Sequence, residues 1–285
     1  MAEAGFPSAT GGIGLRVTGL FVHPIKACAG VPVHALSFSD GGGVVGDREW
    51  AVTDAEGAVT WQGAYPRLAL VRPMLVDGGL RLQAPGMPSL IVPRRQSRWD
   101  CEVRLWNDTR GLHESFAAEE AGADVQAWLA GVVGAPLRLV RLGAAALQRP
   151  SINPVHLVSW PSLRALDAHL HAGAAVGDLM ERLRPNIVVD ALEDEALQPF
   201  DEDHLARIAW PQAGVTLEAT GPCVRCVVPN VDPRTASVGD EPLRGMAALS
   251  ATRHPGQPVR FGVYARSRSA GSLAVGDAGW AELRF

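Results

Sequence analysis

The sequence predicts a mainly β protein with a few helices (α+β), organised as two domains of the barrel or sandwich type. Three observations support this prediction. Short β-branched and aromatic runs follow one another, glycine and proline separate them, and only two segments show clear helical spacing of apolar residues. The chain has 285 residues, which is enough for two cores of ordinary size.

The first half of the chain contains a succession of strand signals. LRVTGLFVHPIKA predicts a strand that ends at Pro24, and REWAVTDAEGAVTWQG predicts two short strands around a turn at residues 54–57. LVRPMLVDGGLRLQAP predicts a hairpin with its turn at residues 77–79, and DCEVRLWND predicts a further strand. The apolar positions expected on one face of these last two strands are Leu80, Leu82, Val103 and Leu105.

Two segments predict helices, and the link between them predicts a domain boundary. AGADVQAWLAGVVG has apolar residues at i, i+3, i+4 and i+7 and a glycine, Gly134, placed to end the helix. In SWPSLRALDAHLHAG, Ser159 is expected to cap the start and Gly173 to end it. LGAAALQRPSIN lies between them and reads as a linker, with a boundary near residue 145. The second half then returns to strands, at HLVSW, PNIVVD, AGVTLEAT, VRFGVYA and GSLAVGD.

Composition excludes several classes of function. The formal charge of −4 and the absence of a basic run argue against a nucleic-acid surface. No apolar stretch has the roughly 18–20 residues that a bilayer requires, so no membrane partner is expected. The start of the chain has neither the basic nor the apolar region of a signal peptide. With four cysteines and no export signal, we expect a reducing, cytoplasmic location.

One feature of the composition points to a binding site. Of the 26 basic residues, 25 are arginine and Lys26 alone is lysine. A coding bias explains arginine at solvated positions, but arginine does not replace a compact, strongly hydrated ammonium group at a site that needs one. Lys26 is therefore a candidate for a specific role, with chance as the alternative explanation.

The pair Cys223 and Cys226 in GPCVRCVVPNVDPRT has four interpretations. A structural zinc site usually takes four ligands, but Cys28 and Cys101 stand alone. A thioredoxin-like dithiol begins a helix, which the two prolines after the pair prevent. The remaining interpretations are two small buried apolar residues, or one thiolate in an electropositive loop that serves as a soft metal ligand.

The motifs together resemble a known family. GPCVRCVVPNVDPRT followed by FGVYARSRSAGSLAVGD resembles the C-terminal half of the MOSC family, especially the branch of the mitochondrial amidoxime-reducing component and its bacterial relatives. VHPIKACAGVPV and GVVGDREWAVTDAEG resemble the N-terminal domain of that family, and LRPNIVVD its central segment. The resemblance implies a MOSC N-terminal β-barrel domain over residues 14–144 and a MOSC barrel domain over residues 145–285.

The resemblance also implies a cofactor and the residues that hold it. In the family the second cysteine of the motif coordinates molybdenum, which assigns that catalytic role to Cys226 and leaves Cys223 as a packed neighbour. The positions matching residues that hold the Mo-molybdopterin cofactor are Lys26, Arg48, Asn153, Arg184, Asn186, Arg225, Cys226 and Tyr264. Cations from distant segments suit the phosphate and dithiolene of this cofactor. The family often has serine after the lysine, where this chain has Ala27. The resemblance also implies pyridoxal phosphate binding, which is attributed to the family.

The implied activity is the reduction of N-hydroxylated compounds such as amidoximes and N-hydroxylated bases. The expected substrate is a small molecule, and no iron–sulfur domain of the kind that some bacterial relatives carry is expected. The electrons are therefore expected from a separate donor protein, ferredoxin-like or a flavin reductase. An alternative is a sulfur or molybdenum-cofactor carrier with a persulfide on Cys226. A third is a MOSC fold that has lost its cofactor.

Overall fold

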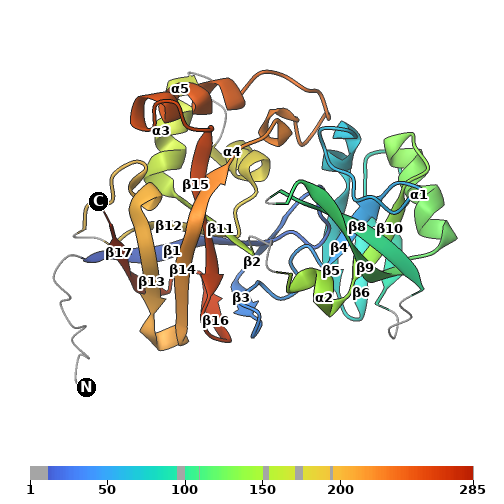
Figure 1. Cartoon of the computed structure of the whole chain (residues 1–285), viewed down its shortest axis with the longest axis horizontal. Coiled ribbons are helices and arrows are strands. Elements are labelled where there is room, and N and C mark those ends of the chain that lie inside the picture. The colour runs from blue at the N-terminus through green and yellow to red at the C-terminus, as the bar shows by residue number, and fades with distance from the viewer. Residues whose placement is uncertain are drawn as a thin grey trace.

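Two β-rich lobes lie side by side and make up the length of the molecule (Figure 1). The computed structural model describes residues 12–94, 100–108, 110–149, 154–170, 176–192 and 195–284. Strands predominate in both lobes, which confirms the mainly β class with a few helices.

A closed barrel of seven strands forms the larger lobe. Its strands are β1 (Gly12–Val22), β11 (Val155–Ser159), β12 (Ile187–Ala191), β13 (Leu205–Trp210), β14 (Val215–Val224), β15 (Arg260–Ser267) and β17 (Ala278–Leu283). The order β12-β11-β15-β14-β13-β17-β1 closes because β1 also pairs with β12. Closure leaves none of these strands with a free edge. Three short strands extend this lobe, since β2 (Val31–Val33) pairs with β1, and β3 (Ala35–Phe38) with β16 (Gly271–Ala274).

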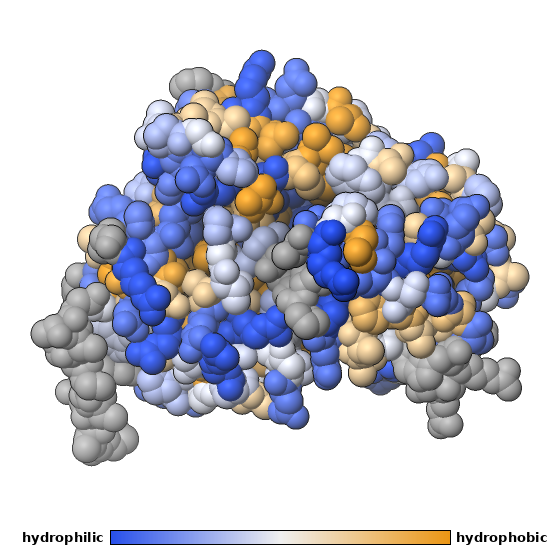
Figure 2. All heavy atoms as spheres, in the orientation of Figure 1, coloured by the Kyte–Doolittle hydropathy of each residue, from blue (hydrophilic) through white to orange (hydrophobic). Residues whose placement is uncertain are grey.

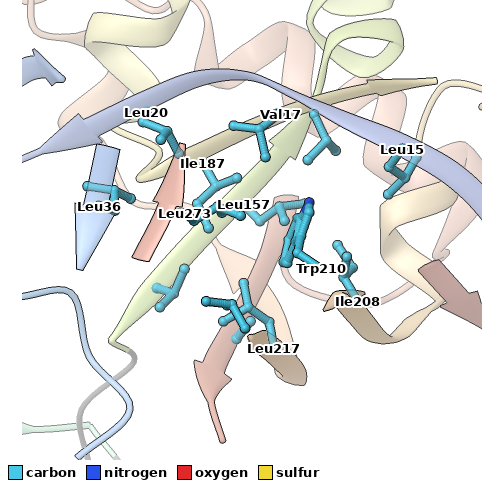
Figure 3. Packing of buried hydrophobic residues seen from close by; sticks show 14 of the residues in the cluster. Leu15, Val17, Leu20, Leu36, Leu157, Ile187, Ile208, Trp210, Leu217 and Leu273 are labelled. Carbon is cyan, nitrogen blue, oxygen red and sulfur yellow. The ribbon is translucent and has the colours of Figure 1, made fainter. Parts of the chain in front are cut away.

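Alternating apolar residues of these strands fill the interior of the barrel. Figure 3 shows side chains from β1, β11, β12 and β13 meeting there, among them Val17, Leu157 and Trp210. Trp210 is fully buried and is one of the largest side chains in the core. Burial of such side chains is the main favourable contribution to folding.

Three helices cover one end of the barrel (Figure 1). They are α3 (Trp160–Leu170), α4 (Val176–Leu183) and α5 (Leu243–Arg253). Ser159 caps α3 as predicted, because its hydroxyl accepts a hydrogen bond from the Ser162 N–H at 3.2 Å. The expected end of that helix at Gly173 lies outside the described residues. Over the described ranges, every helix is too short or too polar to cross a bilayer.

The smaller lobe combines two sheets and a helix. The first sheet has β4 (Trp50–Thr53), β10 (Arg138–Leu142), β9 (Leu112–Glu120) and β8 (Cys101–Asn107), in that order. The second has β5 (Arg72–Val76), β6 (Gly79–Gln83) and β7 (Leu90–Pro93), and α1 (Ala123–Val133) packs beside it. The predicted hairpin is confirmed in β5 and β6, and α1 ends at Gly134 in the left-handed region. After the turn at residues 54–57, the expected second strand is reduced to two isolated bridges, Val59 with Thr53 and Ala58 with Arg104.

The chain passes between the lobes more than twice. After β1, Ile25 and Cys28 pack into the core of the smaller lobe; β2 and β3 then return to the larger lobe, and β4 begins the first sheet of the smaller one. It leaves that lobe through the short helix α2 (Ala144–Leu147), within the segment predicted as a linker. In the described residues, four short 3₁₀ elements complete the secondary structure, at Pro66–Leu70, Asp201–His204, Pro211–Ala213 and Val228–Asn230. The division at residue 145 stays a prediction, and β1 from the first half belongs to the barrel of the second.

Candidate functional site

Arg48 and Asn186 bring the two lobes together in one hydrogen-bonded network. The Asn186 side chain is fully buried, and its Oδ1 accepts from Arg48 Nη1 and from the His156 N–H, both at 3.1 Å. Its Nδ2 donates to Asp47 Oδ1 at 2.9 Å and to the Phe21 carbonyl at 3.2 Å. All four hydrogen-bonding positions of this amide are thus used within the protein.

Arg184 extends this network into the space between the lobes. Its guanidinium donates to the Cys28 carbonyl, and Arg48 Nη2 donates to the Arg184 carbonyl at 3.4 Å. Burial and the nearby Arg48 charge lower the pKa of Arg184 to about 10. The same two arginines and burial hold the pKa of His23 well below its usual range, with burial the largest cause. Two cations, Arg48 and Arg184, are therefore held close together, an arrangement that a bound anion would stabilise.

The backbone at the site is held in unfavourable conformations. Ala27, Arg48 and Arg184 have φ values of 70°, 47° and 60°, in the left-handed region that favours glycine. Such conformations cost about 1–3 kcal/mol each and persist where the surrounding structure enforces them, often at functional sites. Three of the five non-glycine residues with positive φ among the described residues belong to the predicted site or follow its lysine.

A second cluster surrounds the Cys223 sulfur at the end of β14. Arg225 Nη1 donates to Cys223 Sγ at 2.9 Å, and Arg225 Nη2 donates to the Leu183 carbonyl at 3.0 Å. His156 and Tyr264 hydrogen-bond to the same sulfur. Burial alone would raise the pKa of Cys223, but Arg225 and His156 bring it below its usual range. The pKa of Tyr264 is raised by burial and by the Cys223 charge, so its hydroxyl stays protonated at neutral pH.

The two cysteines of the motif have opposite environments. Cys223 is buried in the strand, whereas Cys226 is exposed in the loop that follows it. Val224 and Val227, on either side of Cys226 in the chain, are also exposed, by 51% and 42%. Figure 2 shows hydrophobic residues gathered on the upper part of the surface, in the area where Figure 1 places α4 and the chain between β14 and α5. Cys226 is therefore the thiol accessible to a ligand, with an apolar border.

A cavity of about 470 Å³ lies beside this network, and Lys26 and Arg48 both line it. Burial lowers the pKa of Lys26 to about 8, with contributions from Arg149 and Arg48 in the same direction and an opposing one from Asp108. Of the predicted site residues, Asn153 lies outside the described residues. The others are distributed over the cavity wall (Lys26, Arg48), the buried network (Arg184, Asn186) and the end of β14 with its neighbour β15 (Arg225, Cys226, Tyr264).

Sequence comparison identifies the two halves of the chain. Residues 14–136 match the MOSC N-terminal beta barrel domain, and residues 147–278 match the MOSC domain. The chain belongs to the MOSC family. The resemblance drawn from the cysteine motif and the RPN segment is therefore confirmed at the level of the family.

Two kinds of MOSC protein are among the relatives of this chain. Mitochondrial amidoxime reducing component 2 of Rattus norvegicus is 29% identical over 92% of this chain and 81% of its own length. The Homo sapiens protein of the same name is 26% identical, over 92% of this chain and 82% of its own. Molybdenum cofactor sulfurase of Danio rerio is 27% identical over 91% of this chain, which spans about a third (33%) of that protein. The first group is named for amidoxime reduction and the second for the molybdenum cofactor.

Three residues of this MOSC site escaped prediction from the sequence. Asp47 accepts hydrogen bonds from the His23 N–H, Arg48 and Asn186. His156 joins the Cys223 cluster to Asn186. Arg149 lines the cavity. The sequence contained a clue to Asp47, because this residue stands directly before the predicted site residue Arg48 in VGDR. His156 looked like one residue of an ordinary strand, and nothing in the sequence around Arg149 distinguishes it from the other arginines.

Proposed function

We propose that this protein binds the molybdenum cofactor between its lobes and reduces small N-hydroxylated compounds, such as amidoximes and N-hydroxylated bases. The observation that carries this proposal is the convergence of Arg48, Arg184 and Arg225 from three distant segments around buried polar partners. The exposed Cys226 thiol stands directly after the last of them. The similarity to amidoxime reducing components over most of both chains supports the choice of substrate class.

The residues present fit the cofactor. A terminal phosphate and an anionic dithiolene need several cationic donors, and the cavity and network supply Lys26 and the three arginines. Arg225 keeps a buried Nε without a hydrogen-bond partner among the described residues. The residues that the structure describes include no group of three His, Cys, Asp or Glu side chains that could hold a metal ion. A single thiolate matches a metal that brings its dithiolene with it, whereas structural zinc takes four protein ligands.

In this proposal, residues of the chain bind and orient the cofactor and the substrate. Cys226 would ligate the metal, and the Cys223 sulfur with the Leu183 carbonyl would fix the direction of the Arg225 guanidinium. Tyr264, kept protonated, can donate a hydrogen bond at the same place. When bound, the cofactor supplies two-electron chemistry, so that N–OH takes up two electrons and two protons and leaves as N–H and water. The exposed valines beside Cys226 suit the apolar body of such a substrate.

A separate electron donor is part of the proposal. A separate ferredoxin-like protein or flavin reductase, acting in the cytoplasm, would reduce the metal between turnovers. A donor would approach where Cys226 is exposed, because Cys223 and Asn186 are buried.

The carrier function is the second candidate, and two observations favour it. The chain matches part of a molybdenum cofactor sulfurase at 27% identity, and Cys226 is exposed enough to accept a sulfur atom. A carrier would hold a persulfide that transfers to an acceptor and would show no turnover of N-hydroxylated compounds.

The deciding experiment measures molybdenum and pterin in protein from a cofactor-competent host. Wild type, Cys226→Ala and the control Cys101→Ala, whose thiol lies in the other lobe, are compared. We expect near-stoichiometric molybdenum in wild type and control and its loss in Cys226→Ala, followed by reduction of benzamidoxime with a chemical electron donor. Molybdenum without turnover, together with cyanide-labile sulfur on Cys226, would support the carrier. Absence of molybdenum from wild type would contradict the enzyme.

A further inference from the structure

We propose that Arg149 is a third cation of an anion site in the cavity between the lobes and that, with Lys26 and Arg48, it binds a phosphate monoester. This inference rests on the proposed function, because the cofactor's terminal phosphate is such an ester. It adds a residue that neither the sequence motifs nor the comparisons assign.

The charges that line the cavity leave two cations available. Four cationic residues line it, Lys26, Arg48, Arg94 and Arg149, with three carboxylates, Asp47, Glu49 and Asp108. Arg48 is paired with Asp47, and Arg94 with Glu49, which Arg141 also binds at 2.7 Å. Within the described part of the chain, no ion pair joins Lys26 or Arg149 to a carboxylate, although Asp108 acts on Lys26 and Glu114, which is paired with Arg110, acts on Arg149 from farther away.

The Arg149 guanidinium is anchored at one nitrogen and free at another. Its Nη1 donates to the Ala146 carbonyl at the end of α2, which fixes the side chain to the element that leads out of the smaller lobe. Its Nε is buried and has no hydrogen-bond partner among the described residues. A buried donor of this kind is costly unless a ligand or water satisfies it.

The pKa of Lys26 indicates that positive charges lie close to its ammonium group. Burial is the largest cause of the lowered pKa of Lys26, which is about 8. The second cause is the charge of Arg149; Arg48 acts in the same direction, and Asp108 opposes them. An anion between Lys26 and Arg149 would remove this repulsion and would raise the pKa of the ammonium group. Binding should therefore take up a proton near pH 8 and weaken as the pH rises above it.

The donor set selects the class of anion. Two planar guanidinium groups and one compact ammonium can surround a tetrahedral oxyanion with charge-assisted hydrogen bonds. The cavity, at about 470 Å³, is larger than a phosphate ion, and Trp106, Leu105 and Leu147 supply apolar walls. These features indicate an ester with an organic group rather than inorganic phosphate alone.

The sole lysine allows a direct test on cofactor-free protein from a host without the pterin pathway. Lysine labelled with ¹³C at Cε gives one side-chain NMR signal, that of Lys26, whose pH titration is followed with inorganic phosphate, glycerol phosphate and CMP. In wild type we expect saturable binding of phosphate and an upward shift of the Lys26 pKa. In Arg149→Ala we expect a higher Lys26 pKa before phosphate is added and an affinity about tenfold lower or more, as for a lost charge-assisted hydrogen bond.

Two further variants keep the test decisive. Arg164→Ala removes an exposed charge from the larger lobe and should leave both readouts unchanged, and Arg149→Gln replaces Arg149→Ala if that variant does not fold. Equal affinities for glycerol phosphate and CMP would support recognition of the phosphate group alone, while tighter binding of CMP would support the same site with a nucleotide as its ligand. An unchanged phosphate affinity and Lys26 titration in the Arg149 variants would overturn the inference. Because no molybdenum is involved, this result is independent of whether the proposed activity is found.

Discussion

Asn186 holds the site together because each of its hydrogen-bonding positions reaches a different segment. Through them Arg48, Asp47, Phe21 and the His156 N–H are fixed relative to one another. The sequence suggested contact with the cofactor. The structure shows in addition a full set of contacts within the protein, so we assign Asn186 a positioning role.

Replacement of Asn186 by alanine should affect both stability and cofactor content. The change leaves the His156 N–H and the Phe21 carbonyl buried without this partner, which should lower the free energy of unfolding by about 2 kcal/mol or more. Urea denaturation and molybdenum analysis measure the two effects. Asn107→Ala in the smaller lobe, also a buried asparagine, should retain the cofactor. Retention of wild-type stability and molybdenum in Asn186→Ala would refute the positioning role.

Single residues show what the sequence could predict about the site. Resemblance placed Arg48, Arg184 and Arg225 in one site, and the structure brings them together. The spacing of Cys223 and Cys226 could not tell which thiol is exposed, because that depends on where β14 ends. Burial and partners of an isolated residue such as His156 depend on contacts between distant strands, which no local pattern contains.

At the scale of single elements, a buried carboxylate marks the start of α3. Glu202 is fully enclosed, and its Oε2 accepts from Ser159 Oγ at 2.9 Å and from Ser162 Oγ at 2.8 Å. Burial raises the pKa of Glu202 in spite of these hydrogen bonds. The cap of this helix thus depends on a carboxyl group whose pKa is raised by burial.

This arrangement predicts a pH dependence of stability. The folded pKa lies above the unfolded value of about 4.3, so folding takes up a proton between the two values and the free energy of unfolding falls as pH rises through them. Glu202→Gln cannot titrate, so its stability relative to wild type should improve as the pH is raised from 4 to 8. Denaturation at several pH values tests this, with the exposed Glu56→Gln as control. Parallel pH profiles for wild type and Glu202→Gln would contradict it.

Elements with local determinants were predicted better than those with distant partners. The β5–β6 hairpin and the end of α1 follow from turn residues and periodicity within a few positions. The turn at residues 54–57 was also found, but the strand expected after it consists of two isolated bridges. The partners of β1 were not predictable, because strand pairing between the start and the end of a chain has no local signal.

At the scale of the whole molecule, β1 closes the barrel of the second half. It pairs with β12 on one side and β17 on the other, as in Leu15↔Ala191 and Leu15↔Gly279. Residues 145–285 alone should therefore expose two strand edges and fail to form a stable barrel. The same fragment extended by a flexible linker and residues 12–22 should fold, as judged by dispersed NMR signals and cooperative melting. Cooperative folding of the unextended fragment would show that β1 is dispensable.

The closure by β1 also sets an order for folding during synthesis. β1 leaves the ribosome first among the strands of the larger barrel, yet its partner β17 (Ala278–Leu283) is made last. The sheets of the smaller lobe are complete after β10, so they can form while β1 still waits for its partners. Long-range pairing of this kind is slow, and an open barrel exposes edges to aggregation. A nascent chain stalled before residue 278 should therefore be the form that depends most on chaperones.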